Sequence, residues 1–439
     1  MRFRSCDKAT MDWAMKNGAT RDGATRDGAA WTERPSPSRR ATLGRLGFAG
    51  WFVGCCLLGG SALAQRVGPK TTWEEAKPAQ EALSVPDRAR SLDEGTQEPV
   101  EKIAPDLQAL YMRSQQAQSV IEFNSVIEGC RNIMGDTTRQ ISERAYAKKL
   151  LSWAANRRGE MRSDMAGDMV RNQQLEEAQK LDQSATEDFL LSIEHDPARW
   201  RAHHNLGIAY ALAGAIDDAI GSFTTTLELN PKFVDAYHNR GEMHLRRKDI
   251  AAALADFTRA IQLDPKDAGL VVARGNARLA QGETEAALAD FQSAMSLAPE
   301  SSQNATLFAD TCQSLGRWKE AAEAYQKGMK LDPNHVRCLQ NAAWMMATCP
   351  EEFYRDPPAA LKTIEKAMQC VEGGAGPNLM HVYGVVQAAN GEFSAAVATL
   401  NEAIQLTSDP SLRREIAEHR KLFERKKPFV QSASEEKPR

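Results

Sequence analysis

Residues 200–233 read WRAHHNLGIAYALAGAIDDAIGSFTTTLELNPKF, and segments of the same kind and length follow one another without a gap. Prolines mark the period at Pro197, Pro231, Pro265, Pro299 and Pro333. Alanines and large aromatic residues keep it at Ala185, Ala219, Ala253, Ala287 and Ala321, and at Phe189, Phe223, Phe257, Phe291 and Tyr325. A fixed period of this length indicates a stack of supersecondary units, not one globular core.

Each period predicts two helices. In the quoted segment, Leu206 and Tyr210 recur at helical spacing in the first half, and Ala219 and Phe223 do so in the second. Gly214 lies between them and suits a left-handed helix end. The Asn-Pro pair near the end of the segment stops the second helix, because a residue before proline is pushed out of the α region.

This pattern resembles the tetratricopeptide repeat family, whose 34-residue unit carries small, aromatic and proline residues at set offsets. The resemblance implies an all-α fold, a right-handed α-α superhelix with a disordered N-terminal region. Arg240 departs from the family pattern at a Leu position, and Ala309 at a Gly position. The predicted array covers 200–410, with repeats at 200–233, 234–267, 268–301, 302–335, 336–376 and 377–410.

The flanks of the array predict further helices. Residues 105–199 keep a helical period without the consensus and are interpreted as degenerate helical hairpins, in which the polar stretch 163–183 extends the helices. Residues 411–426 predict a capping helix with one apolar face, which the end of a repeat stack requires. Residues 427–439 are charged and are expected to form a flexible tail.

The N-terminal residues 1–64 are interpreted as a signal or targeting region. Paired arginines at Arg39 and Arg40 precede an uncharged run from Leu46 to Leu63, and an A-x-A site predicts cleavage after Ala64. The arginine pair resembles a twin-arginine export signal, and ordinary secretory export fits equally. Residues 65–104, with several prolines among charged residues, predict a disordered linker.

These features predict a periplasmic or exported protein of a bacterial cell envelope. The alternative is a membrane-anchored protein, in which the run from Leu46 to Leu63 stays uncleaved. A third interpretation is a lipoprotein modified at Cys55, although the preceding residues match the usual motif poorly. Contact with a membrane is expected only through this N-terminal signal or anchor.

Composition and motifs argue against catalysis. The net charge of −3 and the lack of a basic stripe give no attraction for nucleic acid. The sequence has no HExxH, paired CxxC, phosphate-binding glycine loop or GxSxG motif, so we expect no enzyme, cofactor or metal site. The five cysteines beyond residue 64 are scattered, and we interpret them as small buried side chains.

The remaining function is recognition of a protein or peptide. In the family, the first helix of each pair lines a concave surface, and its variable positions contact the partner. The register places Arg201, His204, His238, Glu242, Asn276, Asp310, Arg337, Gln340 and Trp344 at such positions, with Asp235, Gln313 and His381 beside them. The resemblance therefore implies a non-enzymatic scaffold that binds a partner along this surface; the alternative is an accessory subunit tethered to the membrane.

Overall fold

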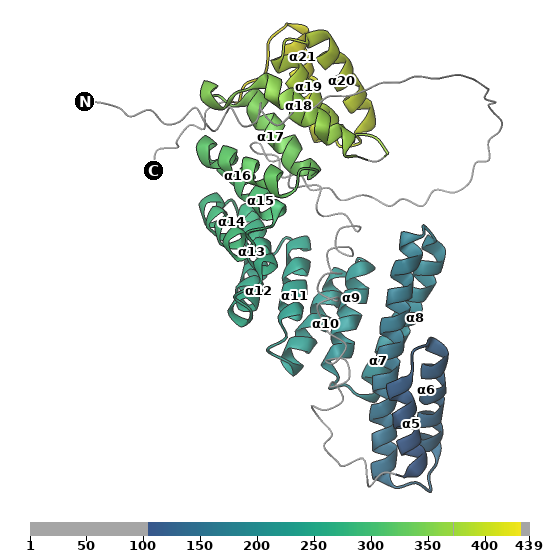
Figure 1. Cartoon of the computed structure of the whole chain (residues 1–439). Coiled ribbons are helices and arrows are strands. Elements are labelled where there is room, and N and C mark those ends of the chain that lie inside the picture. Colours follow the sequence, from purple (N-terminus) through teal and green to yellow (C-terminus); the bar gives the residue numbers. More distant parts are fainter. Residues whose placement is uncertain (1–103, 372, 432–439) are drawn as a thin grey trace, which may run out of the picture. The chain divides into compact units, whose positions relative to one another are not determined.

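The computed structural model describes residues 104–371 and 373–431. The expected signal region, its cleavage site and nearly all of the expected linker lie outside the described residues. Within them the fold is entirely helical, which confirms the predicted class of an all-α stack of helix pairs (Figure 1). No helix in the described part of the chain is long and apolar enough to cross a lipid bilayer.

Two N-terminal helix pairs precede the regular array. They are α5 (Pro105–Gln116) with α6 (Val120–Gly135), and α7 (Ile141–Arg171) with α8 (Leu175–His195). With 31 and 21 residues, α7 and α8 are longer than any later helix of the described chain. The polar stretch 163–183 forms the end of α7 and the start of α8, as expected of a helix extension.

Six helix pairs follow, and the first helices of the first five begin 34 residues apart. They are α9 (Trp200–Leu212) with α10 (Ile216–Leu229), α11 (Val234–Arg246) with α12 (Ile250–Leu263), α13 (Ala268–Gln281) with α14 (Thr284–Leu297), α15 (Ser302–Ser314) with α16 (Trp318–Leu331), α17 (Val336–Thr348) with α18 (Pro357–Gln369), and α19 (Pro377–Ala389) with α20 (Phe393–Leu406). A 3-10 turn, η5 (Glu352–Tyr354), lies between α17 and α18. The last helix is α21 (Pro410–Glu424).

The periodic aromatic residues build the core inside each pair. Phe223, Phe257 and Phe291 are almost fully buried on the second helices. Each ring lies against a glycine of the first helix, and a Cβ atom on Gly275 would stand 2.7 Å from a ring carbon of Phe291. The small residue at this register position is therefore required by the close approach of the two helices.

The structure describes the start of the expected C-terminal tail, residues 427–431, and the rest of the tail lies outside the described residues. The amide of Gln431 donates a hydrogen bond to the carbonyl oxygen of Thr348, at 2.8 Å. The ring of Phe429 lies 5.7 Å from that of Trp344 and 4.2 Å from that of His419. The segment just after α21 is thus bound to α17 through a backbone hydrogen bond and the packing of Phe429 on Trp344.

Candidate functional site

The predicted contact residues share a register but not an environment. Glu242, Asn276, Asp310 and Trp344 follow one another at the repeat period, one on each of α11, α13, α15 and α17, and all four are partly buried. First helices of neighbouring pairs touch at α9 with α11, and at α15 with α17. The surface of these first helices is the candidate site, and the neighbours of each side chain decide what that side chain can do.

On α9, Arg201 and His204 have different roles. Arg201 is exposed, and its guanidinium carbon lies 4.4 Å above the ring of Trp200. His204 packs between Phe223 and Phe233, and its Nε2 atom is 3.1 Å from the side-chain nitrogen of Asn239. Burial lowers the pKa of His204 from 6.5 to about 4, so the ring is neutral at pH 7. The structure thus makes His204 a packing residue that joins α9 to α11.

On α11, the side chains are more open. The ring of His238 lies 5.9 Å from Phe257, and Asp235 is exposed at the start of the helix. Glu242 is half-buried and makes no hydrogen bond or ion pair with any residue that the structure describes. Its carboxylate is therefore available to a group outside the chain.

Asn276 on α13 carries an unsatisfied acceptor. Its Oδ1 atom is buried and has no hydrogen-bond partner among the described residues. Buried polar atoms in folded proteins are nearly always paired, since leaving one unpaired costs about 1–3 kcal/mol. A donor from a partner would remove that cost once the partly exposed side chain of Asn276 turns its oxygen outward, so Asn276 is the predicted residue that best fits a recognition role.

Asp310 on α15 is the centre of an internal network. Its carboxylate accepts hydrogen bonds from the Tyr325 hydroxyl at 2.7 Å, from the Asn341 amide at 2.8 Å and from Arg337 at 2.7 Å. Burial, followed by the charge of Asp310, raises the pKa of Tyr325 well above its usual range. The carboxylate of Asp310 thus joins α15, α16 and α17, whereas Arg337 gives one hydrogen bond to this network and its buried Nε atom has no partner among the described residues. Gln313 also accepts from Tyr325, at 3.0 Å.

Two predicted contact residues on α17 lie in different environments. Gln340 stays half-buried on α17 without a described hydrogen bond. Trp344, in contrast, packs against His381, His419 and Phe429, with ring centroids 5.7, 6.0 and 5.7 Å apart. Trp344 is thus a partly buried packing residue that joins α17 to α19, α21 and the tail. His381, placed on the contact surface by register alone, is buried as well.

Sequence reasoning missed a set of buried ion pairs between the two helices of a pair. Arg240 binds Asp256 through two hydrogen bonds of 2.9 and 2.7 Å, and Arg274 binds Asp290 through bonds of 3.1 and 2.7 Å. Both aspartates are at most 5% exposed. The signal was present in the sequence, since Arg240 and Arg274 are one period apart and the two aspartates keep the same interval.

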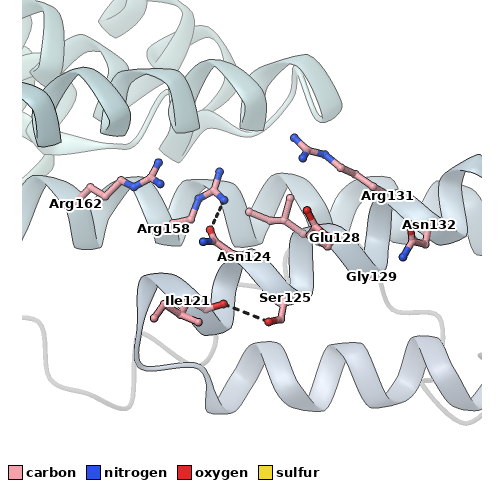
Figure 2. A pocket seen from close by; sticks show the side chains of 10 residues that line it. Ile121, Asn124, Ser125, Glu128, Gly129, Arg131, Asn132, Arg158 and Arg162 are labelled. Atoms are coloured by element: carbon pink, nitrogen blue, oxygen red, sulfur yellow. Dashed lines mark hydrogen bonds between the residues drawn. The ribbon is translucent and has the colours of Figure 1, made fainter.

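An open hollow of about 680 Å³ lies on α6 and α7 (Figure 2). Arg131, Arg158 and Arg162 line it, together with Asn124 and Glu128, and the remaining wall comes from Ile121, Ser125, Ile127, Gly129 and Asn132. Figure 2 shows the guanidinium of Arg158 turned towards Asn124, which accepts its hydrogen bond at 2.6 Å.

The basic charge of this hollow is largely neutralised. Asp188 of α8 is 2% exposed and forms ion pairs with both Arg158 and Arg162. Arg131, the one remaining arginine of its wall, lies one helical turn from Glu128 on α6. The hollow therefore offers little attraction for a strongly anionic ligand.

Comparisons with known proteins agree with this fold. Three family models described as tetratricopeptide repeats match residues 213–268, 241–308 and 278–342. Together they place a tetratricopeptide-repeat array in the middle of the chain, and protein–protein interaction is the usual work of such repeats. No curated protein matches the chain by sequence.

Several solved structures are similar to this one. A tetratricopeptide repeat protein from Parabacteroides merdae is 18% identical, over 61% of this chain and 98% of its own, with a TM-score of 0.45. PilF from Pseudomonas aeruginosa is 18% identical, over 51% and 98%, with a TM-score of 0.42. YrrB, described as a repeat protein with an unusual peptide-binding site, is 17% identical, over 41% and 89%, with a TM-score of 0.33.

Proposed function

We propose that this chain is a non-enzymatic scaffold that binds an extended segment of a partner protein along the first helices of its repeats. Helix-pair repeats present a long surface on which many modest contacts add up. Three predicted residues on that surface, Arg201, Glu242 and Gln340, make no hydrogen bond or ion pair among the described residues, and the buried Oδ1 atom of Asn276 has no partner either. The other predicted contact residues stay predictions.

The buried Oδ1 atom of Asn276 carries the proposal. An extended peptide presents a backbone N–H every residue, and an asparagine amide can accept from that N–H while it donates to the neighbouring carbonyl. Glu242, at the same position one repeat earlier, favours a segment with a lysine or arginine nearby. The proposed ligand is therefore an extended segment that places a basic side chain near α11 and its backbone against α13.

Site-specific photo-crosslinking tests the proposal. A photo-reactive amino acid replaces Glu242 or Gln340 in the full chain expressed in its own cell, and Gln292, exposed on the second helix α14, serves as the control position. We expect a discrete crosslinked protein from the first two positions and none from Gln292. Equal crosslinking from all three positions, or none from any, would overturn the proposed surface.

The identified partner then allows a quantitative test of Asn276. The Asn276→Ala variant should bind the partner segment about 2- to 12-fold more weakly, as expected for one net hydrogen bond. Gln292→Ala should bind as the unchanged chain does. Wild-type affinity of Asn276→Ala would show that the unsatisfied oxygen has no part in recognition.

We further propose that the scaffold works in a bacterial cell envelope after export. The basic run, the apolar segment Leu46–Leu63 and the A-x-A site support this location. The tethered accessory subunit remains the alternative. Mass measurement of the mature N-terminus distinguishes them, because a chain that begins at Gln65 has lost the segment that would hold it in the membrane.

A further inference from the structure

Three potential metal ligands meet between α19 and α21. They are His381 on α19, and Glu415 and His419 on α21, and their ligand atoms all lie within 4.8 Å of one another. The Nε2 atom of His381 is 2.8 Å from the Nδ1 atom of His419. Both histidines are at most 6% exposed, and Glu415 is half-buried.

The packing of α21 fixes this arrangement. Glu415 and His419 are one helical turn apart, so they lie on the same face of the helix. Leu412, Ile416 and Phe423 form a buried cluster with residues of α19 and α20 such as Val385. The face that carries Glu415 and His419 is therefore directed at α19 by the apolar residues beside it.

An apolar shell surrounds the two imidazoles. The His381 and His419 rings stack at 5.0 Å, and Trp344 packs on both. Phe429 covers His419 at 4.2 Å, and Phe423 lies on it at 6.2 Å. A hydrophobic wall behind polar ligands limits water access and strengthens metal coordination.

The hydrogen bond between His381 and His419 does not provide partners for all the polar groups of this site. That bond satisfies one nitrogen on each ring. It leaves the half-buried carboxyl of Glu415 without a hydrogen bond or ion pair to any residue within the described ranges. A cation placed between the three groups would satisfy all of them together.

We propose that His381, Glu415 and His419 bind a divalent transition-metal ion, with zinc as the best fit. Imidazole nitrogens favour zinc over magnesium or calcium, which prefer oxygen ligands, and two histidines with one carboxylate are a common zinc ligand set. Nitrogens at about 2.0–2.1 Å from a tetrahedral zinc are roughly 3.3 Å apart. The rings would separate by about half an ångström on binding, and one coordination position would stay open to water or to a partner group.

The ion would hold the terminal helix in place. One ligand comes from the last helix pair and two come from α21, so binding joins the end of the stack to the helix that covers it. Because the unfolded chain does not hold the three ligands together, metal binding adds to the stability of this end.

Metal titration of the full chain tests the site. The protein carries no histidine tag, is stripped with a chelator and is titrated with zinc chloride or cobalt chloride alone. We expect one ion per chain, a higher Tm in excess zinc and a visible cobalt spectrum without a thiolate charge-transfer band. Failure to bind one ion, or a thiolate band that points to cysteine ligands, would overturn the proposal.

Matched variants locate the ion. Glu415→Gln and His419→Gln keep the size of the side chain, and each should lower the affinity for zinc by more than about tenfold. Loss of a residue that only hydrogen-bonds to a metal ligand already lowers metal affinity by about tenfold, so loss of a ligand itself should lower it further. Both should lose the zinc-dependent rise in Tm. Glu418→Gln, exposed on the same helix, should behave as the unchanged chain. Circular dichroism confirms folding, and unchanged affinity in the folded Glu415→Gln chain would contradict the assignment.

Discussion

At the scale of single residues, Arg274 and Arg278 share the buried carboxylate of Asp290, each at 2.7 Å. Arg240 and Asp256 repeat the first of these pairs one period earlier. A charge that is 3% exposed, as Asp290 is, depends on its partners because solvent cannot stabilise it. These pairs join the first helix to the second. The arginines that form them are therefore engaged within the chain and are less available to bind a partner protein.

The Asp290→Ala variant should lower the free energy of unfolding by about 1.5–3 kcal/mol, since it removes the charged hydrogen-bond partner of two arginines that stay partly exposed to solvent. Urea denaturation followed by circular dichroism measures the loss. Glu285→Ala removes the partner of Arg317 in an exposed pair and should change stability by less than about 1 kcal/mol. Similar effects of the two variants would show that burial of Asp290 does not govern its contribution.

Prediction from the sequence was weakest for the contacts that single side chains make. The register placed Asp310 and Trp344 at the same position of successive first helices. It could not show that Asp310 would bind Arg337 of the next repeat, or that Trp344 would pack on Phe429 of the distant tail. A period reports which face of a helix a residue occupies, whereas its hydrogen-bond partners come from other helices. The grouping of His381 with Glu415 and His419 escaped notice for the same reason.

At the scale of helices, the turns inside the pairs repeat one backbone conformation. Gly214, Gly282 and Gly316 end their first helices with φ of 78°, 86° and 72°. Lys248 occupies the same register position with φ of 65°, although a side chain disfavours this left-handed region. The turn geometry is therefore imposed at this position by the packing of α11 on α12.

Replacing Lys248 with glycine should raise the free energy of unfolding by about 0.5–1 kcal/mol. Glycine removes the energetic cost of the left-handed conformation in the folded chain, and this gain exceeds the entropic cost of the greater freedom of glycine in the unfolded chain. Thermal denaturation detects the change as a higher Tm. Lys266→Gly, an exposed turn residue outside the left-handed region, should lower stability slightly instead. A stabilised Lys266→Gly or a destabilised Lys248→Gly would refute this account of the turn.

Helix pairs were predictable over 200–335 because each repeat encodes its own two helices, turn and proline stop locally. The tail after α21 was not predictable in this way. Its attachment depends on Thr348, which lies several helices earlier in the chain.

At the scale of the whole molecule, the apolar core is a series of separate clusters. One joins Ala253 and Phe257 to Ala273 and Ala277, and another joins Val385 and Leu400 to Ile416 and Phe423. Most of each cluster comes from neighbouring helices, so stability spreads from pair to pair along the stack, and the last cluster also reaches Trp344 of α17. The last cluster is closed by α21.

A chain that ends after Asp409 should lose protection at α19 and α20 and self-associate, because removal of α21 exposes the apolar face formed by Val385, Ala388 and Leu400. Hydrogen exchange and light scattering measure the two effects. Exchange in α11 to α14 should stay unchanged, since these helices share no cluster with α21. Uniform loss of protection would indicate one cooperative core in place of a repeat stack.

The spacing of the arginine–aspartate pairs has a genetic consequence. Arg240 and Arg274 each precede their aspartate by the same interval, and the two pairs are offset by one period. A deletion of one period that begins shortly before Arg240, and so also removes Asp256, removes one complete pair. A deletion of the same length that begins between Arg240 and Asp256 instead joins Arg240 to Asp290 at the original distance. One that begins between Arg274 and Asp290 places Ala324 where Asp290 stood and leaves Arg274 without its acidic partner. The gene can therefore lose one repeat without leaving an unpaired arginine when the break falls at or before Arg274, and not when it falls within the second pair.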